Sequence, residues 1–457
     1  MVRSIGLQYL VGIDGVSLWL VLLTTFLFPV SILASWGIER DVRLYMVAML
    51  VLETAVLGTF VALDLLLFFL FFEALLVPMY LIIGGWGGER RVYAAVKFFL
   101  FTMAGSAFLL VGILFLYARS RTGGGTGTFE LQTLRDVAGA LPVTTARWLF
   151  LAFLVAFAVK VPLFPLHTWL PDAHTEAPTA GSVLLAGVLL KVGTYGLIRF
   201  NLDLFPEASR YFADFVSVLA VIGIVYGAVC ALMQTDIKRL VAYSSVSHLG
   251  FVVLGLFAFT TQGVTGGVLQ MVNHGLATGA LFLLVGMVYE RTHTRQLGEM
   301  GGLASFMPWR LGTFLFAVFA SVGLPGLNNF VGEFLVIVGT FAVSHWFGSL
   351  AAIGVILAAI YLLWSYQRMA HGPVHEEHRH LPDVSVRETL VIAPVLALLL
   401  VLGVYPKLVT QSVDPATQRV IARVQPTQRT ADVGDALAAT TAAEREGSTE
   451  PAVEEAP

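Results

Sequence analysis

Long apolar stretches recur along almost the whole chain and are separated by short polar segments. Each stretch is close to the roughly 20 residues that an α-helix needs to cross a bilayer. Twelve such stretches, numbered here as spans one to twelve, cover residues 15–36, 43–62, 64–84, 94–117, 146–166, 180–200, 212–233, 238–258, 264–289, 309–341, 345–366 and 388–405. The pattern predicts an all-α, polytopic membrane protein with about 12 transmembrane helices.

Two of these spans are interrupted by residues that break helices. The fifth carries Pro162 and Pro165 directly behind Lys160, and the tenth, too long for one straight crossing, carries Pro325 within GLPGLNN. A proline removes a backbone hydrogen bond and kinks or ends a helix. Because the broken spans are five apart, two units built around them cross the membrane in opposite senses, as in inverted-repeat transport folds. We therefore predict two inverted five-helix repeats, each with one broken helix.

The same pattern sets the expected division of the chain. An N-terminal span lies within residues 1–42, the two repeat halves cover residues 43–200 and 201–370, and a cytoplasmic loop with the last span covers residues 371–406. Beyond that span the apolar pattern stops. The Ala-, Thr- and Glu-rich acidic composition of residues 407–457 predicts a disordered tail.

The loops between the spans differ in their positive charge. Those that follow odd-numbered spans carry twelve Lys and Arg residues, whereas those that follow even-numbered spans carry six. Positively charged loops remain in the cytoplasm. The loops after odd-numbered spans are therefore predicted to be cytoplasmic, and both ends of the spanning region to lie outside.

Composition supports the membrane assignment and excludes several kinds of site. The chain is 57% hydrophobic and 12% charged, with a mean hydropathy of +0.82, whereas soluble domains are about 25% charged. The net charge of −3 favours no nucleic-acid partner. A single cysteine, Cys230, excludes disulfides and sites built on cysteine pairs. No phosphate-binding loop precedes a helix, and GGGTG at 123–127 is interpreted as a plain loop. We expect no cofactor and no metal on this chain.

Ionisable residues inside the apolar spans are the candidates for function. At this depth such residues face the bundle interior, pair with one another and mark ion or proton paths. The predicted proton-transfer residues are Glu73, Lys160, Lys191, His248, His274 and Glu333. Pro162, Pro165 and Pro325 are predicted to form the helix breaks that admit water beside them. A structural role as interhelical hydrogen-bonding residues remains open for His248 and His274.

Lys160 lies where two unfavourable free energies coincide. A cation at bilayer depth loses its hydration, and the broken helix beside it leaves backbone carbonyls without hydrogen bonds. Burial disfavours the charged form of a lysine, whereas a carboxylate about 4 Å away restores about 4 kcal/mol at an effective dielectric constant near 20. A glutamate that moves toward or away from Lys160 can therefore switch its proton affinity. This reasoning favours Lys160 as a proton carrier and Glu73 as the group that switches it.

Other polar residues have simpler interpretations. Glu53 lies in span two without a helix break or an evident partner, and we favour a structural role for it. The loop HGPVHEEHRH at 371–380 has the composition of a metal site, but a solvated cytoplasmic connection is favoured.

Several long segments carry a resemblance to a known family. GIDGVSLWLVLLT, FFEALLVPMYLIIGGWGG, AFAVKVPLFPLHTWLPDAHTEAPTAGSVLLAGVLLKVGTYGLIRF, QTDIKRLVAYSSVSHLGFV and GLPGLNNFVGEF resemble subunit M of proton-pumping NADH–quinone oxidoreductase, respiratory complex I, within the antiporter-like subunit family. The resemblance covers about residues 9–406. The positions that match the family's glutamates, lysines and axis histidines are Glu73, Lys160, Lys191, His248, His274 and Glu333.

The resemblance implies a function. The chain would be an antiporter-like, proton-translocating module that couples quinone reduction to proton pumping, with the redox centres on other subunits. It implies other membrane-arm subunits as partners, protons as the transported species, and a multi-pass location in the inner membrane of a bacterium. A subunit of an Mrp-type cation/proton antiporter is the alternative. A purely structural membrane scaffold is disfavoured by the two buried lysines.

One departure from the family concerns the first residues. Family members have fourteen spans, two of them before the GIDGVS segment, whereas the present sequence starts close to that segment. We therefore expect residues 1–36 not to be the true beginning of the fold.

Overall fold

The computed structural model describes residues 6–121, 126–373 and 380–425. Paired extended backbone within these ranges consists of isolated bridges, such as that between Val11 and Ala62. The remaining regular structure is helical, with the bounds α1 Gly15–Ala34, α2 Val42–Val61, α3 Leu65–Ala74, α4 Leu76–Trp86, α5 Arg91–Ser120, α6 Leu131–Gly139, α7 Val143–Lys160, α8 Trp169–Glu176, α9 Thr179–Leu184, η2 Leu185–Leu189, α10 Leu190–Gly196, η3 Leu197–Leu202, α11 Pro206–Tyr211, α12 Ala213–Leu232, α13 Ile237–Phe257, α14 Thr261–Thr292, η4 Leu297–Glu299, η5 Leu303–Ser305, α15 Pro308–Val322, α16 Asn328–Phe341, α17 His345–Ala370, α18 Val386–Val404 and α19 Lys407–Val424.

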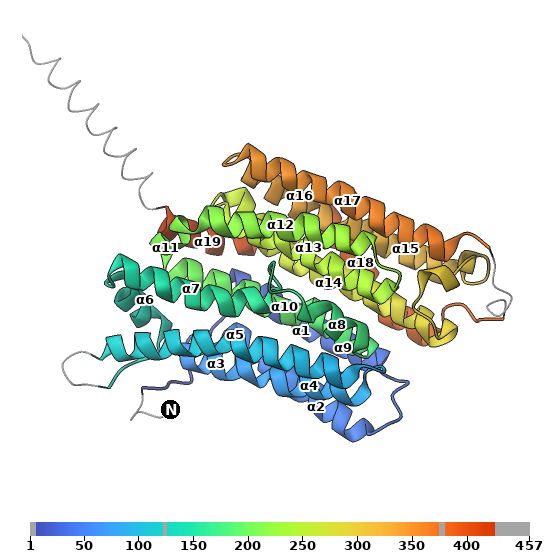
Figure 1. The fold of residues 1–457 in the computed structure, drawn as a ribbon, viewed down its shortest axis with the longest axis horizontal. Helices are drawn as coiled ribbons and strands as arrows, with labels where there is room; N and C mark the ends of the chain where they lie inside the picture. The colour runs from blue at the N-terminus through green and yellow to red at the C-terminus, as the bar shows by residue number, and fades with distance from the viewer. Residues whose placement is uncertain (1–5, 122–125, 374–379, 426–457) are drawn as a thin grey trace, which may run out of the picture.

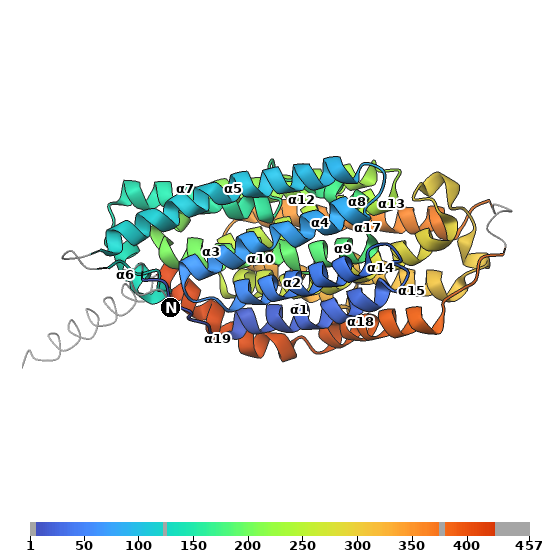
Figure 2. The same ribbon diagram turned by 90° about the horizontal axis from the view of Figure 1, so that it is seen from below.

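The long helices lie side by side along one common direction, the long axis of the molecule (Figure 1). Among the described residues, 11 helical segments are long and apolar enough to cross a membrane, and the shorter α15 and α16 together make one further crossing. The predicted twelve spans are thereby confirmed. Figure 2 shows α18 and α19 beside α1, so the last described helices lie next to the first one.

Short polar residues set where several of these helices begin. The side chains of Asp14, Asp64 and Asp236 each accept hydrogen bonds from backbone N–H groups in the first turn of α1, α3 and α13. Such caps satisfy donors that a helix start leaves unpaired. All three residues lie at or beside the predicted ends of spans.

Both predicted helix breaks are present. The fifth span ends as α7 at Lys160 and resumes as α8 at Trp169, with Pro162 and Pro165 between the two halves. The tenth span is interrupted between α15 and α16 around Pro325, where Gly323 and Gly326 adopt φ values of 82° and 94° that favour glycine. The chain runs from α7 to α8 in one direction and from α15 to α16 in the opposite direction (Figure 1).

Two further spans contain helix irregularities that the sequence indicates less clearly than the two breaks. The third span is divided at Leu75 into α3 and α4, directly after Glu73 and Ala74. Pro78 accounts for this division because it has no N–H to donate to the Ala74 carbonyl. The sixth span contains two π-helical turns, η2 and η3, on either side of α10.

The prediction of a disordered tail from residue 407 is wrong for its first part. Lys407–Val424 forms α19, which buries Val409, Val413 and Ala416 on one face. Its polar residues also hold it in place, since Trp19 Nε1 donates to Ser412 Oγ at 2.7 Å and Thr265 donates to Asp414 at 2.9 Å. The helix was missed because its mean hydropathy is low and its apolar face is narrow. Residues 426–457 lie outside the described part of the chain.

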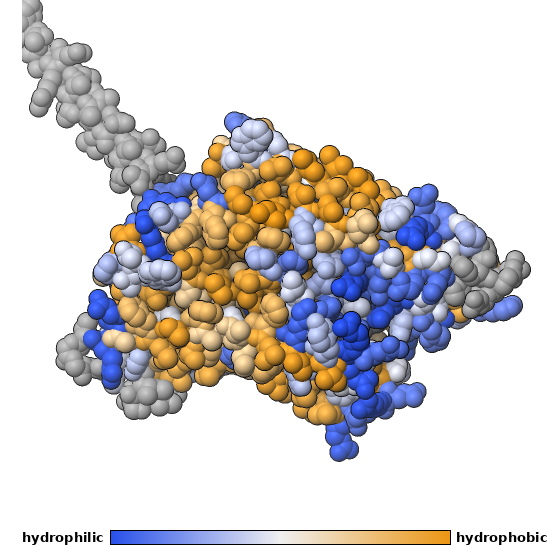
Figure 3. All heavy atoms as spheres, in the orientation of Figure 1, coloured by the Kyte–Doolittle hydropathy of each residue, from blue (hydrophilic) through white to orange (hydrophobic). Residues whose placement is uncertain are grey.

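Burial within the bundle identifies its centre. The most apolar stretches of the sixth span and of α14 are 100% buried and that of α13 is 94% buried, whereas those of α17 and α18 are 33% buried. These three central segments carry Lys191, His274 and His248. Apolar residues cover much of the outer surface, and hydrophilic residues gather toward the end that holds α8 and α15 (Figure 3).

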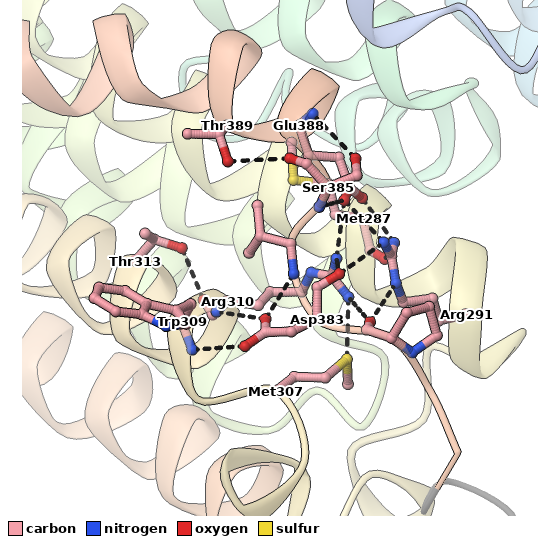
Figure 4. Close-up of polar contacts among 12 residues, drawn as sticks. Met287, Arg291, Met307, Trp309, Arg310, Thr313, Asp383, Ser385, Glu388 and Thr389 are labelled. Atoms are coloured by element: carbon pink, nitrogen blue, oxygen red, sulfur yellow. Dashed lines mark hydrogen bonds and ion pairs between the residues drawn. The ribbon is translucent and has the colours of Figure 1, made fainter.

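An ionic cluster ties three helices together at that hydrophilic end. Glu388, at the start of α18, accepts from Arg291 of α14 at 2.7 and 2.8 Å and from Arg310 of α15 at 3.1 Å. Asp383 accepts from the backbone N–H groups of Trp309 and Arg310 at 3.0 and 3.1 Å (Figure 4). The cluster anchors the first half of the broken tenth span to the central helix α14.

Candidate functional site

Lys191 lies at the centre of the bundle and is fully buried. The π turn η2 precedes it, and Leu190 N–H bonds the Leu185 carbonyl five residues back. The Ala186 carbonyl in the same turn accepts from Lys191 Nζ. Nζ also lies 2.7 Å from His274 Nδ1 on α14. π turns occur frequently at functional sites, and this one provides both a backbone acceptor and the approach to a histidine.

Two histidine rings extend the contact away from Lys191. The rings of His274 and His248 have centroids 5.8 Å apart and are tilted by 55°. His248 Nδ1 lies 2.7 Å from Glu333 Oε1 on α16. The Nε2 atoms of both rings are buried without a hydrogen-bond partner among the described residues. Lys191, His274, His248 and Glu333 therefore form one continuous polar line, called here the central line.

Amide side chains hold the Glu333 end of the central line. Gln270 Nε2 donates to Glu333 Oε1 at 2.9 Å. One turn further along α14, Asn273 Nδ2 donates to the Asn328 carbonyl at 2.7 Å, and Asn328 Nδ2 donates back to the Asn273 carbonyl at 3.0 Å. Residues of α14 thus position α16 immediately after the second helix break.

The second break also reaches Glu333 directly. A Cβ atom built on Gly323 would lie 3.4 Å from Glu333 Oε2. One carboxylate oxygen of Glu333 therefore contacts His248 and Gln270, while the other faces the interruption between α15 and α16.

Lys160 lies at the last position of α7, and 3% of the residue is exposed. Its Nζ lies over the ring of Phe72 at 4.8 Å and near that of Phe98 at 5.8 Å. Cation–π contacts of this kind stabilise a cation that has been taken out of water. Among the described residues no carboxylate lies within ion-pair distance of Nζ, so aromatic rings form its immediate environment.

Glu73 lies next to Phe72 at the end of α3, beside the division between α3 and α4. Its Oε1 is buried without a hydrogen-bond partner among the residues described. The charges of Glu73 and Lys160 interact, yet the two groups do not form a direct ion pair in the described structure. The structure thus places both predicted residues at one site but separates their charged ends.

Close helix packing connects the Lys160 site to the central line. A Cβ atom on Gly193 would lie 2.9 Å from Lys160 Cβ and 2.8 Å from Val161 N. Only glycine permits α10 to lie this close to the first break. Lys191 is two residues from this contact, so the two predicted lysines lie on either side of the crossing between α10 and the end of α7.

His174 was not among the predicted residues, although it is fully buried and neither ring nitrogen has a hydrogen-bond partner among the described residues. Its ring stacks on Phe282 with centroids 4.7 Å apart. The charges of both Lys238 and Lys191 act on it. The sequence signal was a histidine in the half-helix that directly follows the first break.

Lys238, the first residue of predicted span eight, was counted among the twelve positive charges of the loops after odd-numbered spans, but the structure buries it at the start of α13. Its Nζ donates to the Ala177 carbonyl. A cavity of about 360 Å³ adjoins it, lined also by Glu176, Glu290 and Arg295. This burial was not predicted, because the sequence does not show which part of the protein covers the start of α13.

The remaining candidates stay apart from this site. Glu53 is half-buried on α2, where no hydrogen bond or ion pair to it is found among the described residues. No group of three residues suited to bind a metal occurs in the described part of the chain. Residues 374–379 of the histidine-rich loop and 122–125 of the Gly-rich loop lie outside the described residues, so neither interpretation is tested.

Comparison with known proteins places this geometry in a family. Residues 62–360 match the family model described as NADH:quinone oxidoreductase/Mrp antiporter, transmembrane. NADH-quinone oxidoreductase subunit M of Rhodobacter capsulatus is 48% identical over 428 residues, which cover 91% of this chain and 82% of that protein. Subunit M of Rickettsia prowazekii is 44% identical over 405 residues, covering 88% of this chain and 81% of that protein.

Solved structures agree with these relatives. A chain of respiratory complex I from Thermus thermophilus superimposes with a TM-score of 0.86 at 35% identity, covering 93% of this chain and 88% of that chain. A chain of the Mrp complex from Dietzia gives a TM-score of 0.79 at 20% identity, covering 91% of this chain and 84% of that chain. The second likeness is one of fold alone.

The family match and the fold with its two oppositely directed broken helices place the chain in the class of antiporter-like membrane subunits. The chain belongs to the NADH:quinone oxidoreductase/Mrp antiporter family, and within it to the family of NADH-quinone oxidoreductase subunit M. It is a multi-pass subunit of the membrane arm of respiratory complex I, in the bacterial inner membrane. The Mrp alternative is the more distant one.

Proposed function

We propose that the central line from Lys191 to Glu333 carries protons across the middle of the bundle. The observation that carries this proposal is the pair of 2.7 Å contacts at the two ends, Lys191 Nζ to His274 Nδ1 and His248 Nδ1 to Glu333 Oε1. The two rings have centroids 5.8 Å apart, and their Nε2 atoms have no hydrogen-bond partner among the described residues. Histidine can accept a proton at one ring nitrogen and release one from the other.

The transfer proceeds in three steps. Lys191 Nζ gives a proton to His274 Nδ1, which leaves a neutral amine and an imidazolium. His274 then releases the proton on Nε2 to Nε2 of His248, directly or through one water. Finally His248 gives the proton on Nδ1 to the Glu333 carboxylate. Each step moves one proton, and the line is reset when both rings return to their starting tautomers.

Lys160 and Glu73 control the supply of protons to this line. Lys160 is held by aromatic rings rather than by a carboxylate, so a movement of Glu73 at the α3–α4 division changes its electrostatic environment strongly. Approach of Glu73 stabilises the protonated lysine, and withdrawal favours release toward Lys191 across the Gly193 crossing. Quinone reduction elsewhere in the complex would drive this movement.

The helix breaks give the line its access to water. Pro162 and Pro165 interrupt the helix beside Lys160, and the break around Pro325 faces Glu333 Oε2. Irregular backbone at membrane depth is tolerated where it lines a hydrated path. Glu333 is therefore the terminal group of the line in this chain. We further propose that NADH oxidation and quinone reduction take place on other subunits and that proton transfer through this chain needs no cofactor or metal of its own.

The test is proton translocation by the assembled complex in inverted membrane vesicles driven by NADH. Lys191→Met removes the first donor of the line and should abolish or strongly reduce the number of protons moved per electron pair. Lys407→Met, at an exposed lysine of α19, is the matched control and should behave as the wild type. Unchanged proton translocation by Lys191→Met would refute the proposed path.

A further inference from the structure

A small charged cavity lies at the end of the bundle opposite the hydrophilic loops, the end predicted to face outside. Its volume is about 100 Å³, and its charged lining residues are Asp14, Arg135, Arg199, Asp203, Arg419 and Arg423. They come from four separate parts of the chain, namely the cap of α1, α6, the η3 region of span six, and α19. This cavity is called here the outer arginine cavity.

The carboxylates of the cavity are already engaged. Asp203 accepts from Arg135 Nε at 2.8 Å and from Arg423 Nη1. Asp14 pairs with Arg199 Nη2 at 2.8 Å, and Arg199 Nε donates to Tyr195 at 3.1 Å. Asp14 thus pairs with one arginine, and Asp203 is shared by two.

The charge of the cavity is not balanced. Four guanidinium groups face two carboxylates, so two positive charges remain without a counter-charge among the lining residues. Arg419 donates only to a carbonyl of its own helix, Pro415 O at 3.2 Å, among the described residues. Each guanidinium carries five N–H donors, and no partner for Arg199 Nη1, Arg423 Nη2 or either terminal nitrogen of Arg419 is found among the described residues. Arg419 and Arg423 are exposed, so these donors are open to an anion that approaches from the surface.

The excess of positive charge lies on the side of the membrane that is predicted to face outside. Positive residues are scarce in the loops after even-numbered spans, yet Arg135 and Arg199 converge here with two arginines of α19. A cluster on the side of the membrane where positive charge is otherwise avoided indicates that an anion compensates it. Arginine binds phosphate through its planar fork of donors.

Neighbouring residues indicate the source of that phosphate. The segment that leads into Asp14 exposes Tyr9, Val11 and Ile13, which are 70%, 43% and 58% exposed. The cavity lies at the start of α1 and at the last turn of span six, and helix ends of membrane-spanning segments lie near the lipid headgroups. Basic pockets at helix ends bind anionic phospholipid headgroups, and the exposed apolar residues offer a surface to the acyl chains.

We propose that the outer arginine cavity binds the phosphate of one anionic phospholipid from the outer leaflet. The lipid links α6 and α19 to the outer end of the helix that carries Lys191. This site is separate from the proposed proton path, and its existence does not depend on that path.

The experiment uses the intact, purified complex depleted of lipid and then supplied with phosphatidylglycerol or phosphatidylcholine. Native mass spectrometry counts the lipids retained, and a titration with headgroup-labelled phosphatidylglycerol measures affinity. Arg419→Gln is the mild variant, because its side chain is exposed and makes only a contact within its own helix. The double variant Arg419→Gln with Arg423→Gln is the stronger one, and Arg210→Gln, an exposed arginine of α11 at the same end, is the matched control.

The proposal predicts one retained phosphatidylglycerol fewer in the double variant, no change in Arg210→Gln, and no matching site for phosphatidylcholine. Arg419→Gln should weaken labelled lipid by about tenfold, because a hydrogen bond to a charged group is worth about that factor. Wild-type lipid number and affinity in both variants would overturn the proposal. So would displacement of the lipid by equimolar inorganic phosphate, which would indicate a small-anion site. Loss of a neighbouring subunit with unchanged lipid content would instead assign the arginines to a protein contact.

Discussion

His248 Nδ1 lies 2.7 Å from Glu333 Oε1, across the interface between α13 and the second half of the broken tenth span. Both residues are nearly fully buried. Removing one member of a buried, hydrogen-bonded pair leaves the other uncompensated. The contact therefore links the position of α16 after its break to the protonation of a histidine at the centre of the bundle.

Replacement of His248 tests the middle of the central line. His248→Phe keeps an aromatic ring of similar size but removes both nitrogens, so proton transfer from His274 to Glu333 is interrupted. We expect a large loss of NADH-driven proton translocation in assembled complexes, measured in vesicles. His345→Phe, at the start of α17 and away from the line, is the control. Wild-type translocation by His248→Phe would leave His248 with a structural role only.

Glu73 and Glu53 are both half-buried, but the charge of Glu73 interacts with Lys160, so the two should respond differently to the same change. Glu73→Gln keeps the size of the side chain but removes the charge that acts on Lys160, so we expect severe loss of proton translocation. Glu73→Asp should be milder because the charge is retained. Glu53→Gln should be nearly silent. Equal effects of Glu73→Gln and Glu53→Gln on protons moved per electron pair would show that Glu73 has no special part in loading Lys160.

The orientation of the chain follows from the distribution of positive charge among its loops. Single cysteines introduced as Arg239→Cys or Arg295→Cys, in a background that carries Cys230→Ser, should react only with reagents that cross the membrane. Arg121→Cys, at an exposed position of the opposite end, should react with impermeant reagents added outside intact cells. The reverse labelling pattern would invert the assigned topology.

The ionic cluster at the hydrophilic end should contribute to assembly rather than to proton transfer. Glu388→Gln leaves the fully buried Arg310 without its charged partner, and breaking a buried pair in this way costs about 3–5 kcal/mol. We expect less assembled complex and earlier thermal dissociation. The complexes that do assemble should pump the normal number of protons per electron pair. Glu89→Gln, at an exposed glutamate of the same end, should change neither quantity.

The sequence predicted the spans, the breaks and the ionisable residues because the bilayer imposes simple rules. A crossing helix needs about 20 apolar residues, so Lys160 and Glu333 are visible as exceptions inside such stretches. Pro162, Pro165 and Pro325 are visible because proline cannot complete the backbone hydrogen bonds of a helix. These positions depend on local sequence alone.

The partners of these residues could not be predicted in the same way. Glu73 was predicted to switch the proton affinity of Lys160, but the sequence did not show that Lys160 lies over Phe72 or that Lys191 contacts His274 directly. Such choices depend on helix register and on close approaches such as that at Gly193. No residue type in the sequence signals the π turn before Lys191. The helix α19 is too polar to resemble a membrane span.

Proton translocation per electron pair in complexes that carry Lys160→Arg is the sharpest test of whether Lys160 carries a proton. Arginine retains the positive charge beside Phe72 and Glu73, but with a pKa above about 12 it does not release its proton. If Lys160 is a proton carrier, the number of protons moved per electron pair must fall toward that of Lys160→Ala, measured together with NADH–quinone turnover. A normal value in Lys160→Arg would show that a fixed positive charge suffices and would contradict the carrier mechanism.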